Sequence, residues 1–583
     1  MAHHNSNNLR KMLRRRPGDV KVFGGAGERT MMLAGLMQQV PLTLNLVRER
    51  VGDLYPNKTV TTRFHDRIHV IGYAAMLDRA GQLANYLAGI GVGRGMRVAT
   101  LAWNSHRHLE LYLAVPCMGA VLHTINARLL APDIARLLAH AGDQVLFVDR
   151  SIWRTIGREI VLPSGVRHVV IMEDEVDPSI DPPAPMGTPA TLYEAAIAGH
   201  GSAFAWPDLD ENEASGLCYT SGTTGDPKGV LYSHRSTTLH TLACLFADGI
   251  AMRERDVCLP AVPMFHANAW GFPYAALMAG AALALPCRQI DPVALVELVE
   301  VAQVTMATAV PTVWLGFLDH LGKHPQAVAR IASLRRLPVG GAAIGQSFID
   351  GFARLGIEVM HCWGMTEISP LGLTNVARSD LDTEETRSTR TAQGLPIPGC
   401  RFRNVDAEGV PCGRDGTTPG ELRISSPWAA ASYFAGPADQ APSADSFAVE
   451  DGRTWLKTGD IATIDRHGYV RIVDRAKDLI KSGGEWISSQ ALELQIMNHP
   501  DVREAAAIGR PDPKWQERPV ICVVLRSDAA EPRERFAREY RDYLASFFPK
   551  WQIPDEVIFC AELPKGKTGK IDKIALRRTF GSS

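Results

Sequence analysis

The stretch Tyr219–Val230, which reads YTSGTTGDPKGV, is the most informative part of this chain. Its three glycines allow the backbone to approach an anion closely and to turn N–H groups toward it. Its hydroxyl side chains add hydrogen-bond donors and oxygen ligands for Mg²⁺, and Lys228 adds a positive charge that can reach a phosphate. These features favour a loop that binds a polyphosphate and its metal, with a flexible surface turn as the alternative.

The flanking residues indicate a specialised link between two strands. Residues 216–219 before the loop and 230–232 after it are mostly apolar, as in two strands joined by a tight connection. The loop differs from a Walker-type phosphate loop, because Lys228 is followed by Gly229 where that pattern requires Ser or Thr. A kinase or GTPase interpretation therefore loses its main support.

The composition restricts the class of protein. A length of 583 residues predicts at least two domains, and 46% hydrophobic with 21% charged residues is typical of a soluble globular chain. The formal net charge of −1 argues against a nucleic-acid-binding protein. The ten cysteines show neither a CxxC pair nor zinc-like spacing, which fits a reducing compartment. Because we find neither a secretory signal nor a transmembrane segment, we expect a cytoplasmic protein.

The pattern of apolar residues predicts an α/β fold. From about residue 70 to about residue 310, helix-like and strand-like runs alternate, which favours largely parallel sheets. The helix candidates include Met76–Ile90 and His106–Met118, and the strand candidates include Arg97–Ala102 and Gln144–Val148. After residue 395, turn-rich and β-branched segments predict a small β-rich subdomain. Beyond about residue 476, two further helices and strands predict a small independent α/β unit.

Two segments carry candidate nucleotide-binding side chains. In WGMTE, Trp363–Glu367, an aromatic residue beside a glycine can stack on a flat ring such as adenine, and the carboxylate can ligate Mg²⁺. The alternative is a Trp–Gly turn with a surface Glu. In Thr458-Gly459-Asp460, an aspartate at a turn can bind ribose hydroxyls, and the alternative is a simple Asx turn.

A third segment, 564–571, places three lysines between glycines near the end of the chain. Such a sequence predicts a mobile, cationic arm. A solvated tail is the ordinary interpretation, and the arm gains a functional meaning only if it can reach the phosphate loop.

Taken together and in this order, the segments resemble the adenylate-forming (AMP-binding) superfamily of acyl-CoA synthetases, firefly luciferase and peptide-synthetase adenylation domains. The resemblance runs from about residue 40 to residue 578 and includes a fifth segment, DRAKDLIKSGGEWIS, from Asp474. The sequence PMFHANAW at 263–270, together with KSGGEWIS, resembles the bacterial fatty acyl-CoA synthetase branch in particular. Methylthiopropionyl-CoA ligases share much the same signature.

The resemblance implies an α/β fold with a large N-terminal domain of two α/β sheets plus a small β-rich subdomain. A small mobile α/β C-terminal domain would follow it as a lid. We expect a partly disordered N-terminal extension at 1–39, an AMP-binding (adenylation) domain at 40–475 and the lid at 476–583.

The resemblance also implies a nucleotide site. Contacts to the phosphates would come from Thr220, Ser221, Gly222, Thr223, Thr224, Gly225 and Lys228. The rest of the ATP site would comprise Trp363, Gly364, Met365, Thr366, Glu367, Asp460, Arg475 and Lys570. Within these sets Thr220 and Glu367 would hold Mg²⁺, and Asp460 and Arg475 would bind the ribose.

The remaining roles concern catalysis and the acid. The catalytic groups would be Lys570, Glu367, Thr220 and Lys228, with Lys570 reaching the reacting carboxylate and the α-phosphate. Lys477 would be the hinge of the lid. His266 would shape the acyl pocket, and Trp270 would be its aromatic gate. The family usually has Tyr where this chain has Trp363, so stacking should persist while the local hydrogen bonding changes.

The implied activity is ATP-dependent conversion of a carboxylic acid to acyl-AMP, followed by transfer to CoA with release of AMP. We expect a medium- to long-chain fatty acid as the substrate, with a small acid such as 3-methylthiopropionate as the alternative. Transfer to a carrier protein or to oxygen, and a non-catalytic nucleotide-binding protein, are further alternatives. The resemblance also implies a homodimer, and peripheral membrane contact is compatible with a fatty-acid substrate.

Overall fold

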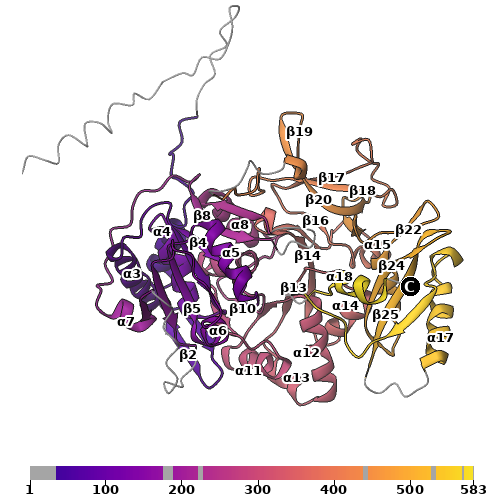
Figure 1. The fold of residues 1–583 in the computed structure, drawn as a ribbon, viewed down its shortest axis with the longest axis horizontal. Helices are drawn as coiled ribbons and strands as arrows, with labels where there is room; N and C mark the ends of the chain where they lie inside the picture. The colour runs from indigo at the N-terminus through magenta and orange to yellow at the C-terminus, as the bar shows by residue number, and fades with distance from the viewer. Residues whose placement is uncertain are drawn as a thin grey trace, which may run out of the picture. The chain divides into compact units, whose positions relative to one another are not determined.

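The computed structural model describes residues 35–174, 188–220, 227–436, 444–526, 533–566 and 570–581. The chain divides into two units, Met1–Pro41 and Leu42–Ser583. In the first unit the described residues, 35–41, contain no helix or strand. The second unit contains all the elements described below, and Figure 1 labels many of them.

A seven-stranded sheet has the order β7-β6-β5-β3-β4-β8-β9. Its neighbours pair in parallel except for β8 and β9, which are antiparallel. All five residues of β5 are buried, as expected for a parallel strand covered on both faces. The strands are β3 (Arg97–Leu101), β4 (Val121–Thr124), β5 (Val145–Asp149), β6 (His168–Met172), β7 (Ala190–Leu192), β8 (Ala214–Tyr219) and β9 (Gly229–Ser233). The helices between them are α4 (His106–Cys117), α5 (Ala131–Ala141), α6 (Arg150–Ile156) and α7 (Tyr193–Ala198).

A nine-stranded sheet has the order β16-β15-β14-β13-β12-β10-β11-β1-β2 and is parallel from β14 to β1. Its strands are β1 (Thr59–Arg63), β2 (Ile68–Gly72), β10 (Val257–Pro260), β11 (Ala282–Leu285), β12 (Met306–Thr308), β13 (Arg336–Val339), β14 (Glu358–Gly364), β15 (Leu371–Thr374) and β16 (Leu395–Pro396). The helices of this part are α2 (Asn45–Leu54), α3 (Tyr73–Gly89), α8 (His234–Leu245), α9 (Ala267–Trp270), α10 (Phe272–Ala279), α11 (Pro292–Ala302), α12 (Pro311–Lys323), α13 (Ala327–Arg330), α14 (Gln346–Ala353) and α15 (Thr383–Thr389). The predicted alternation of helices and strands is confirmed.

The β-rich subdomain is a separate antiparallel sheet. Its strands are β17 (Arg401–Val405), β18 (Gly420–Ser425), β19 (Phe447–Glu450), β20 (Arg453–Ile464) and β21 (Val470–Arg475). The turn predicted at Thr458–Asp460 is wrong, because these residues lie inside β20. Gly459 has a φ of 71°, which bends the strand locally without a chain reversal.

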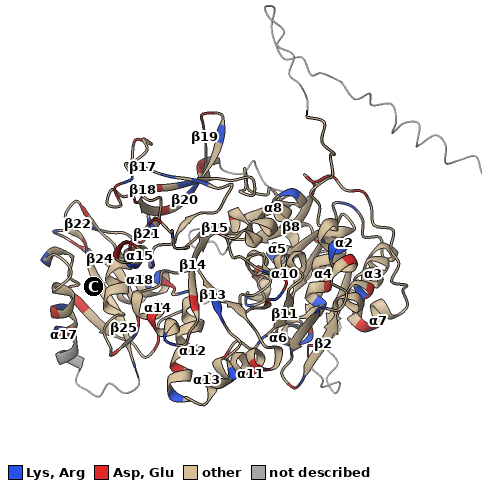
Figure 2. Cartoon of the chain, turned by 180° about the vertical axis from the view of Figure 1, so that it is seen from behind, with Lys and Arg blue, Asp and Glu red and all other residues tan. Residues whose placement is uncertain are grey.

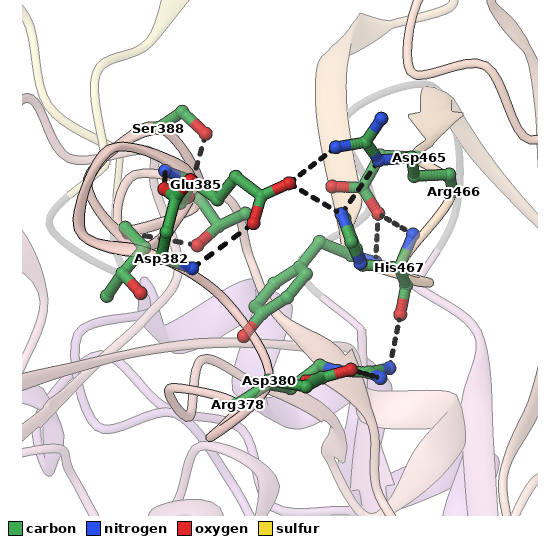
Figure 3. A network of polar contacts seen from close by, with 11 residues as sticks. Arg378, Asp380, Asp382, Glu385, Ser388, Asp465, Arg466 and His467 are labelled. Atoms are coloured by element: carbon green, nitrogen blue, oxygen red, sulfur yellow. Dashed lines mark hydrogen bonds and ion pairs between the residues drawn. The ribbon is translucent and has the colours of Figure 1, made fainter.

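A network of polar side chains fixes the turn between β20 and β21 to α15 (Figure 3). Arg466 and His467 in this turn both pair with Glu385 of α15. Asp382 caps α15 by accepting the backbone N–H of Glu385 at 2.8 Å. Arg378 Nη1 donates to the carbonyl oxygen of His467 at 3.0 Å. The end of β20 is thereby tied to the segment that follows β15.

The C-terminal elements surround hydrophobic clusters of their own, drawn from residues between Ile480 and Phe580. The strands are β22 (Ile480–Ser482), β23 (Glu485–Ile487), β24 (Val502–Asp512), β25 (Gln516–Leu525) and β26 (Glu556–Phe559). The helices are α16 (Ser489–Ile496), α17 (Arg533–Ala545) and α18 (Lys573–Phe580). Figure 1 shows these elements in the orange-to-yellow part of its colour range, with β24 and β25 beside α17.

The charged residues are intermixed over the elements, as Figure 2 shows for Lys and Arg against Asp and Glu. This distribution accords with the formal net charge of −1. Within the described ranges, every helix is too short or too polar to cross a membrane.

Candidate active site

The glycine-rich stretch connects β8 to β9, so the predicted strand–loop–strand arrangement is confirmed. Thr220 and Lys228 lie opposite each other where the strands end. The Thr220 N–H donates to the carbonyl oxygen of Lys228 at 2.9 Å, and the Lys228 N–H donates to Thr220 Oγ1 at 3.3 Å. The other predicted phosphate ligands lie outside the described residues: Ser221, Gly222, Thr223, Thr224 and Gly225.

Tyr433 connects this loop to Glu367. The Nζ of Lys228 lies 4.6 Å from the centroid of the Tyr433 ring, and the Tyr433 hydroxyl donates to Glu367 Oε1 at 2.8 Å. The segment around Tyr433 is itself attached to both motifs, because Phe434 N donates to the Gly229 oxygen at 2.8 Å and Ala430 N to the Glu367 oxygen at 2.7 Å. Sequence reasoning missed Tyr433, since 66 residues separate it from Glu367 and no motif surrounds it.

Glu367 is a buried carboxylate, only 6% exposed, so the alternative of a surface Glu is wrong. Burial raises its pKa, while the hydrogen bond from Tyr433 and the charges of Arg475 and Lys228 act in the opposite direction. Its oxygens and the Thr220 hydroxyl are hard donors that suit Mg²⁺. In the described part of the chain, we find no group of three or more His, Cys, Asp or Glu side chains that would form a complete protein cage. This donor set fits a magnesium ion that takes most of its ligands from phosphates and water.

Trp363 and Asp460 form the second half of the site. Trp363 lies near the end of β14, and its Nε1 donates to Asp460 Oδ2 at 2.9 Å. Arg475 pairs with Asp460 across β20 and β21, with Nε and Oδ1 2.7 Å apart. Burial raises the pKa of Asp460, and Arg475, the indole N–H and Lys570 lower it. A buried carboxylate is therefore held in place by an indole and a guanidinium.

The residues between Trp363 and Glu367 shape the turn that joins β14 to β15. A Cβ at Gly364 would lie 1.9 Å from the carbonyl oxygen of Pro370, so the β14–β15 hairpin requires glycine there. The Met365 N–H donates to the same oxygen at 3.2 Å. The carbonyl oxygen of Thr366 accepts a hydrogen bond from the Tyr232 hydroxyl at 2.8 Å. These bonds fix the turn that carries Glu367.

Lys570 reaches the site from the C-terminal segment. A Cβ at Gly341, just after β13, would lie 3.4 Å from Lys570 Cε and 3.9 Å from its Nζ. The residue keeps exposed surface, yet crowding by protein atoms and repulsion from Arg475 lower the pKa of Lys570 to about 8, while Asp460 raises it. The last lysine of the predicted cationic arm thus lies with the nucleotide-side residues.

His266 and Trp270 flank an unusual turn. The residues of α9, Ala267–Trp270, have φ values between 43° and 58°, so this turn is left-handed. Such backbone costs on the order of 1–2 kcal/mol per non-glycine residue and is retained where the surroundings enforce it. The indole of Trp270 is thereby directed toward β13, where a Cβ at Gly340 would lie 3.5 Å from its Cη2. Burial, with smaller effects from Lys570 and Arg128, lowers the pKa of His266 to about 4.

Lys477 lies in the turn between β21 and β22 and is exposed. The backbone on either side of it is bonded, because Ala476 N donates to the Gly459 oxygen at 3.0 Å and Asp478 N to the Arg475 oxygen at 2.9 Å. The turn is the link between the β-rich sheet and the C-terminal elements.

The AMP-binding enzyme family matches residues 49–434, and the AMP-binding enzyme C-terminal domain matches residues 491–570. The chain is 44% identical over 558 residues to a long-chain-fatty-acid–CoA ligase of Thermus thermophilus, which covers 95% of this chain and 98% of that protein. It is 42% identical over 520 residues to a 3-methylmercaptopropionyl-CoA ligase of Ruegeria pomeroyi, with coverage of 87% and 91%. Among solved structures, the anthranilate CoA ligase AuaEII in complex with anthranoyl-AMP superposes with a TM-score of 0.79 at 23% identity, covering 93% of this chain and 98% of that one. That likeness concerns the fold, and it confirms the α/β class with a large N-terminal and a smaller C-terminal part.

Proposed function

The chain belongs to the AMP-binding enzyme family, and we propose that it is an ATP- and CoA-dependent ligase that converts a carboxylic acid to its acyl-CoA. The observation that carries this proposal is the position of Lys570. Lys570 belongs to the C-terminal elements, yet a Cβ at Gly341, just after β13, would lie 3.4 Å from its Cε. The charges of Asp460 and Arg475 also act on its pKa. A cation delivered to a nucleotide site from the far end of the chain suits a reaction at a phosphate.

The proposed chemistry has two steps. A carboxylate oxygen attacks the α-phosphorus of ATP, and the bond between this phosphorus and the oxygen that bridges the α- and β-phosphates breaks. Pyrophosphate is released, and acyl-AMP is formed. The sulfur of CoA then attacks the acyl carbon as the thiol loses its proton, and AMP leaves with the bonding electrons. No protein nucleophile is needed, because the mixed anhydride is the activated species.

The residues have distinct tasks in this scheme. Lys228, next to Tyr433, would bind the β- and γ-phosphates with Thr220 and the residues of the loop. Lys570 in its charged form would stabilise the negative charge that develops between the carboxylate and the α-phosphate. Glu367 and Thr220 would hold Mg²⁺, which when bound neutralises charge on the phosphates.

The two steps would require different lid positions. The nearness of Lys570 to Gly341, together with the influence of Asp460 and Arg475 on its pKa, supports the first step, adenylation, as the one that this arrangement would serve. For the second step, the C-terminal part would rotate about Lys477 and withdraw Lys570. The predicted boundaries of 1–39, 40–475 and 476–583 place this hinge at the start of the lid.

For the substrate, we propose a medium- to long-chain fatty acid. The high identity with a protein named a long-chain-fatty-acid–CoA ligase supports this choice, and the Trp270 turn supplies an aromatic group for an acyl gate. A small thioether acid such as 3-methylthiopropionate is the second candidate, supported by the relative named for that activity. We further propose a cytoplasmic homodimer with at most peripheral membrane contact.

The test measures AMP release from ATP with octanoate, palmitate and 3-methylthiopropionate, each with and without CoA. We expect CoA-dependent turnover that is fastest with one of the two fatty acids, and hydroxamate trapping of acyl-AMP when CoA is omitted. A preference for 3-methylthiopropionate would favour the second candidate. If neither AMP nor a hydroxamate forms with any carboxylic acid, the ligase proposal is wrong and a non-catalytic nucleotide-binding protein remains. Size-exclusion chromatography with light scattering, which measures the mass of the particle in solution, tests the homodimer.

A further inference from the structure

The indole of Trp363 is fixed in one orientation by three neighbours. Its ring meets that of Phe402 edge-on, with centroids 5.6 Å apart and planes inclined by 72°. On β15, a Cβ at Gly372 would lie 3.2 Å from Cζ3 of the indole, so glycine allows close contact there. The Nε1 of Trp363 donates to Asp460 Oδ2 at 2.9 Å. The indole therefore has a defined direction relative to the carboxylate.

The two oxygens of Asp460 are held by different groups. Arg475 Nε lies 2.7 Å from Oδ1, and the indole N–H bonds to Oδ2. Asp460 is only 2% exposed, and its backbone N–H donates a hydrogen bond to Thr458 Oγ1 at 3.1 Å. A carboxylate with one donor on each oxygen cannot rotate freely, yet each oxygen retains a lone pair for another donor. Asp460 is thus prepared to accept two further hydrogen bonds in a fixed plane.

A ribose has two neighbouring hydroxyl groups, and each of them can donate a hydrogen bond to one oxygen of such a carboxylate. We propose that Trp363 is a positioning residue for the ribose of ATP, since its indole N–H holds Asp460 in the orientation that accepts the 2′- and 3′-hydroxyls. The inference rests on the proposed function as an ATP-dependent ligase and adds a second task to a ring expected to stack on adenine. A phenyl ring at this position keeps a flat face but lacks the N–H, so the two tasks can be separated by Trp363→Phe.

The test compares ATP with 2′-deoxy-ATP and 3′-deoxy-ATP in the pyrophosphate-release reaction of the full chain, with one acid held at saturation. For the unaltered protein, kcat/KM should favour ATP. Trp363→Phe should lower the ratio of kcat/KM for ATP to kcat/KM for each deoxy nucleotide about tenfold, the factor that corresponds to the loss of a hydrogen bond to a charged group. A loss of stacking alone would lower kcat/KM for all three nucleotides by the same factor and would leave the preference unchanged, which overturns the inference.

Trp455→Phe is the matched control. Trp455 lies on β20, the strand that carries Asp460, and is 8% exposed. Its Nε1 has no hydrogen-bond partner among the described residues. This variant removes an indole N–H from the same strand and should keep the preference for ATP. Thermal unfolding of both variants shows whether either has lost stability.

Two further measurements make the result specific. In an Asp460→Ala background, Trp363→Phe should have no additional effect on the preference, because no side-chain oxygen remains for the indole N–H to orient. Calorimetric titration with AMP and 2′-deoxy-AMP measures ribose selectivity without any acid. If the unaltered protein binds AMP selectively but forms no acyl-AMP from any acid, the proposed function fails alone. If it forms acyl-AMP and Trp363→Phe keeps full ribose selectivity in both assays, this inference fails alone.

Discussion

Arg526, which follows β25, forms an ion pair with Asp319 of α12, with Nη1 and Oδ1 2.9 Å apart. Close by, Ser347 Oγ donates to Asn498 Oδ1 at 3.2 Å. These contacts lie at a cavity of about 440 Å³ between α12, α14 and the C-terminal elements. They connect the part of the chain that supplies Lys570 to the part that contains the link between β8 and β9.

Breaking this ion pair should shift the balance between the two half-reactions. Its side chains are 44% and 34% exposed, so the pair stabilises the present arrangement only weakly. We expect Asp319→Ala to lower the ratio of the adenylation rate to the thioester-forming rate about two- to fivefold. Rapid-quench measurement of each half-reaction checks this ratio, and exchanging the charges (Asp319→Arg with Arg526→Asp) should restore it. An equal change in both rates would contradict a role in lid position.

Lys570→Ala should block adenylation selectively. In the proposed mechanism the lysine faces the carboxylate and the α-phosphate in the first step, and loss of one such donor costs on the order of 10²–10³ in rate. Conversion of supplied acyl-AMP and CoA to acyl-CoA should be largely unaffected. Lys565→Ala is the control, because Lys565 belongs to the same segment but pairs with Glu504. Equal loss of both steps in Lys570→Ala would count against the assignment.

The rate of adenylation should fall at alkaline pH. In the proposed mechanism Lys570 must be protonated to act, and crowding by protein atoms and repulsion from Arg475 lower its pKa to about 8. The charged fraction is therefore nearly complete below pH 7 and declines as the pH rises through about 8. We expect kcat/KM for adenylation, which reports the free enzyme, to show this alkaline limb. Lys570→Arg keeps its charge and should lose the limb even if it is slower, whereas persistence of the limb would assign it to another group.

Tyr433→Phe should raise the magnesium concentration that adenylation requires. The hydroxyl is the hydrogen-bond donor to Glu367 Oε1, and without it the buried carboxylate is more easily protonated. We expect the magnesium concentration for half-maximal adenylation to rise about tenfold, with a smaller effect at saturating magnesium. Tyr232→Phe, which removes a bond to the Thr366 carbonyl instead, serves for comparison.

Lys477→Pro should restrict the hinge. Proline fixes φ and also limits the residue before it, so rotation of the C-terminal part would be hindered. Adenylation should proceed at close to the normal rate, while thioester formation from supplied acyl-AMP slows at least tenfold (about 1.4 kcal/mol). Lys477→Ala keeps the backbone mobile and should retain both steps. A normal second step in the proline variant would show that the chain turns elsewhere.

The sequence predicts most of the scaffold because its signals are local. Alternating apolar runs locate elements such as β3 and α4, and apolar residues on both sides of a glycine-rich stretch locate the link between β8 and β9. It does not predict Tyr433, whose role comes from a contact 66 residues away in the chain. It also misplaces Asp460 in a turn, since Gly459 normally breaks a strand and here only bends it. The position of Tyr433 beside Glu367 and that of Asp460 within β20 both depend on contacts between distant parts of the chain, and the spacing of residues in the sequence does not reveal such contacts.

If Trp270 forms the acyl gate as proposed, the left-handed turn at α9 restricts how acid preference can change during evolution. β-Branched side chains are strongly disfavoured at positive φ, so Ala267 and Ala269 have few acceptable replacements. Gly271 is restricted further, because a Cβ there would lie 2.5 Å from the ring of His240. Relatives that act on acids of a different chain length would therefore be expected to replace residues 267–271 together, or to change residues near Gly340 that contact Trp270, rather than to change this turn one residue at a time.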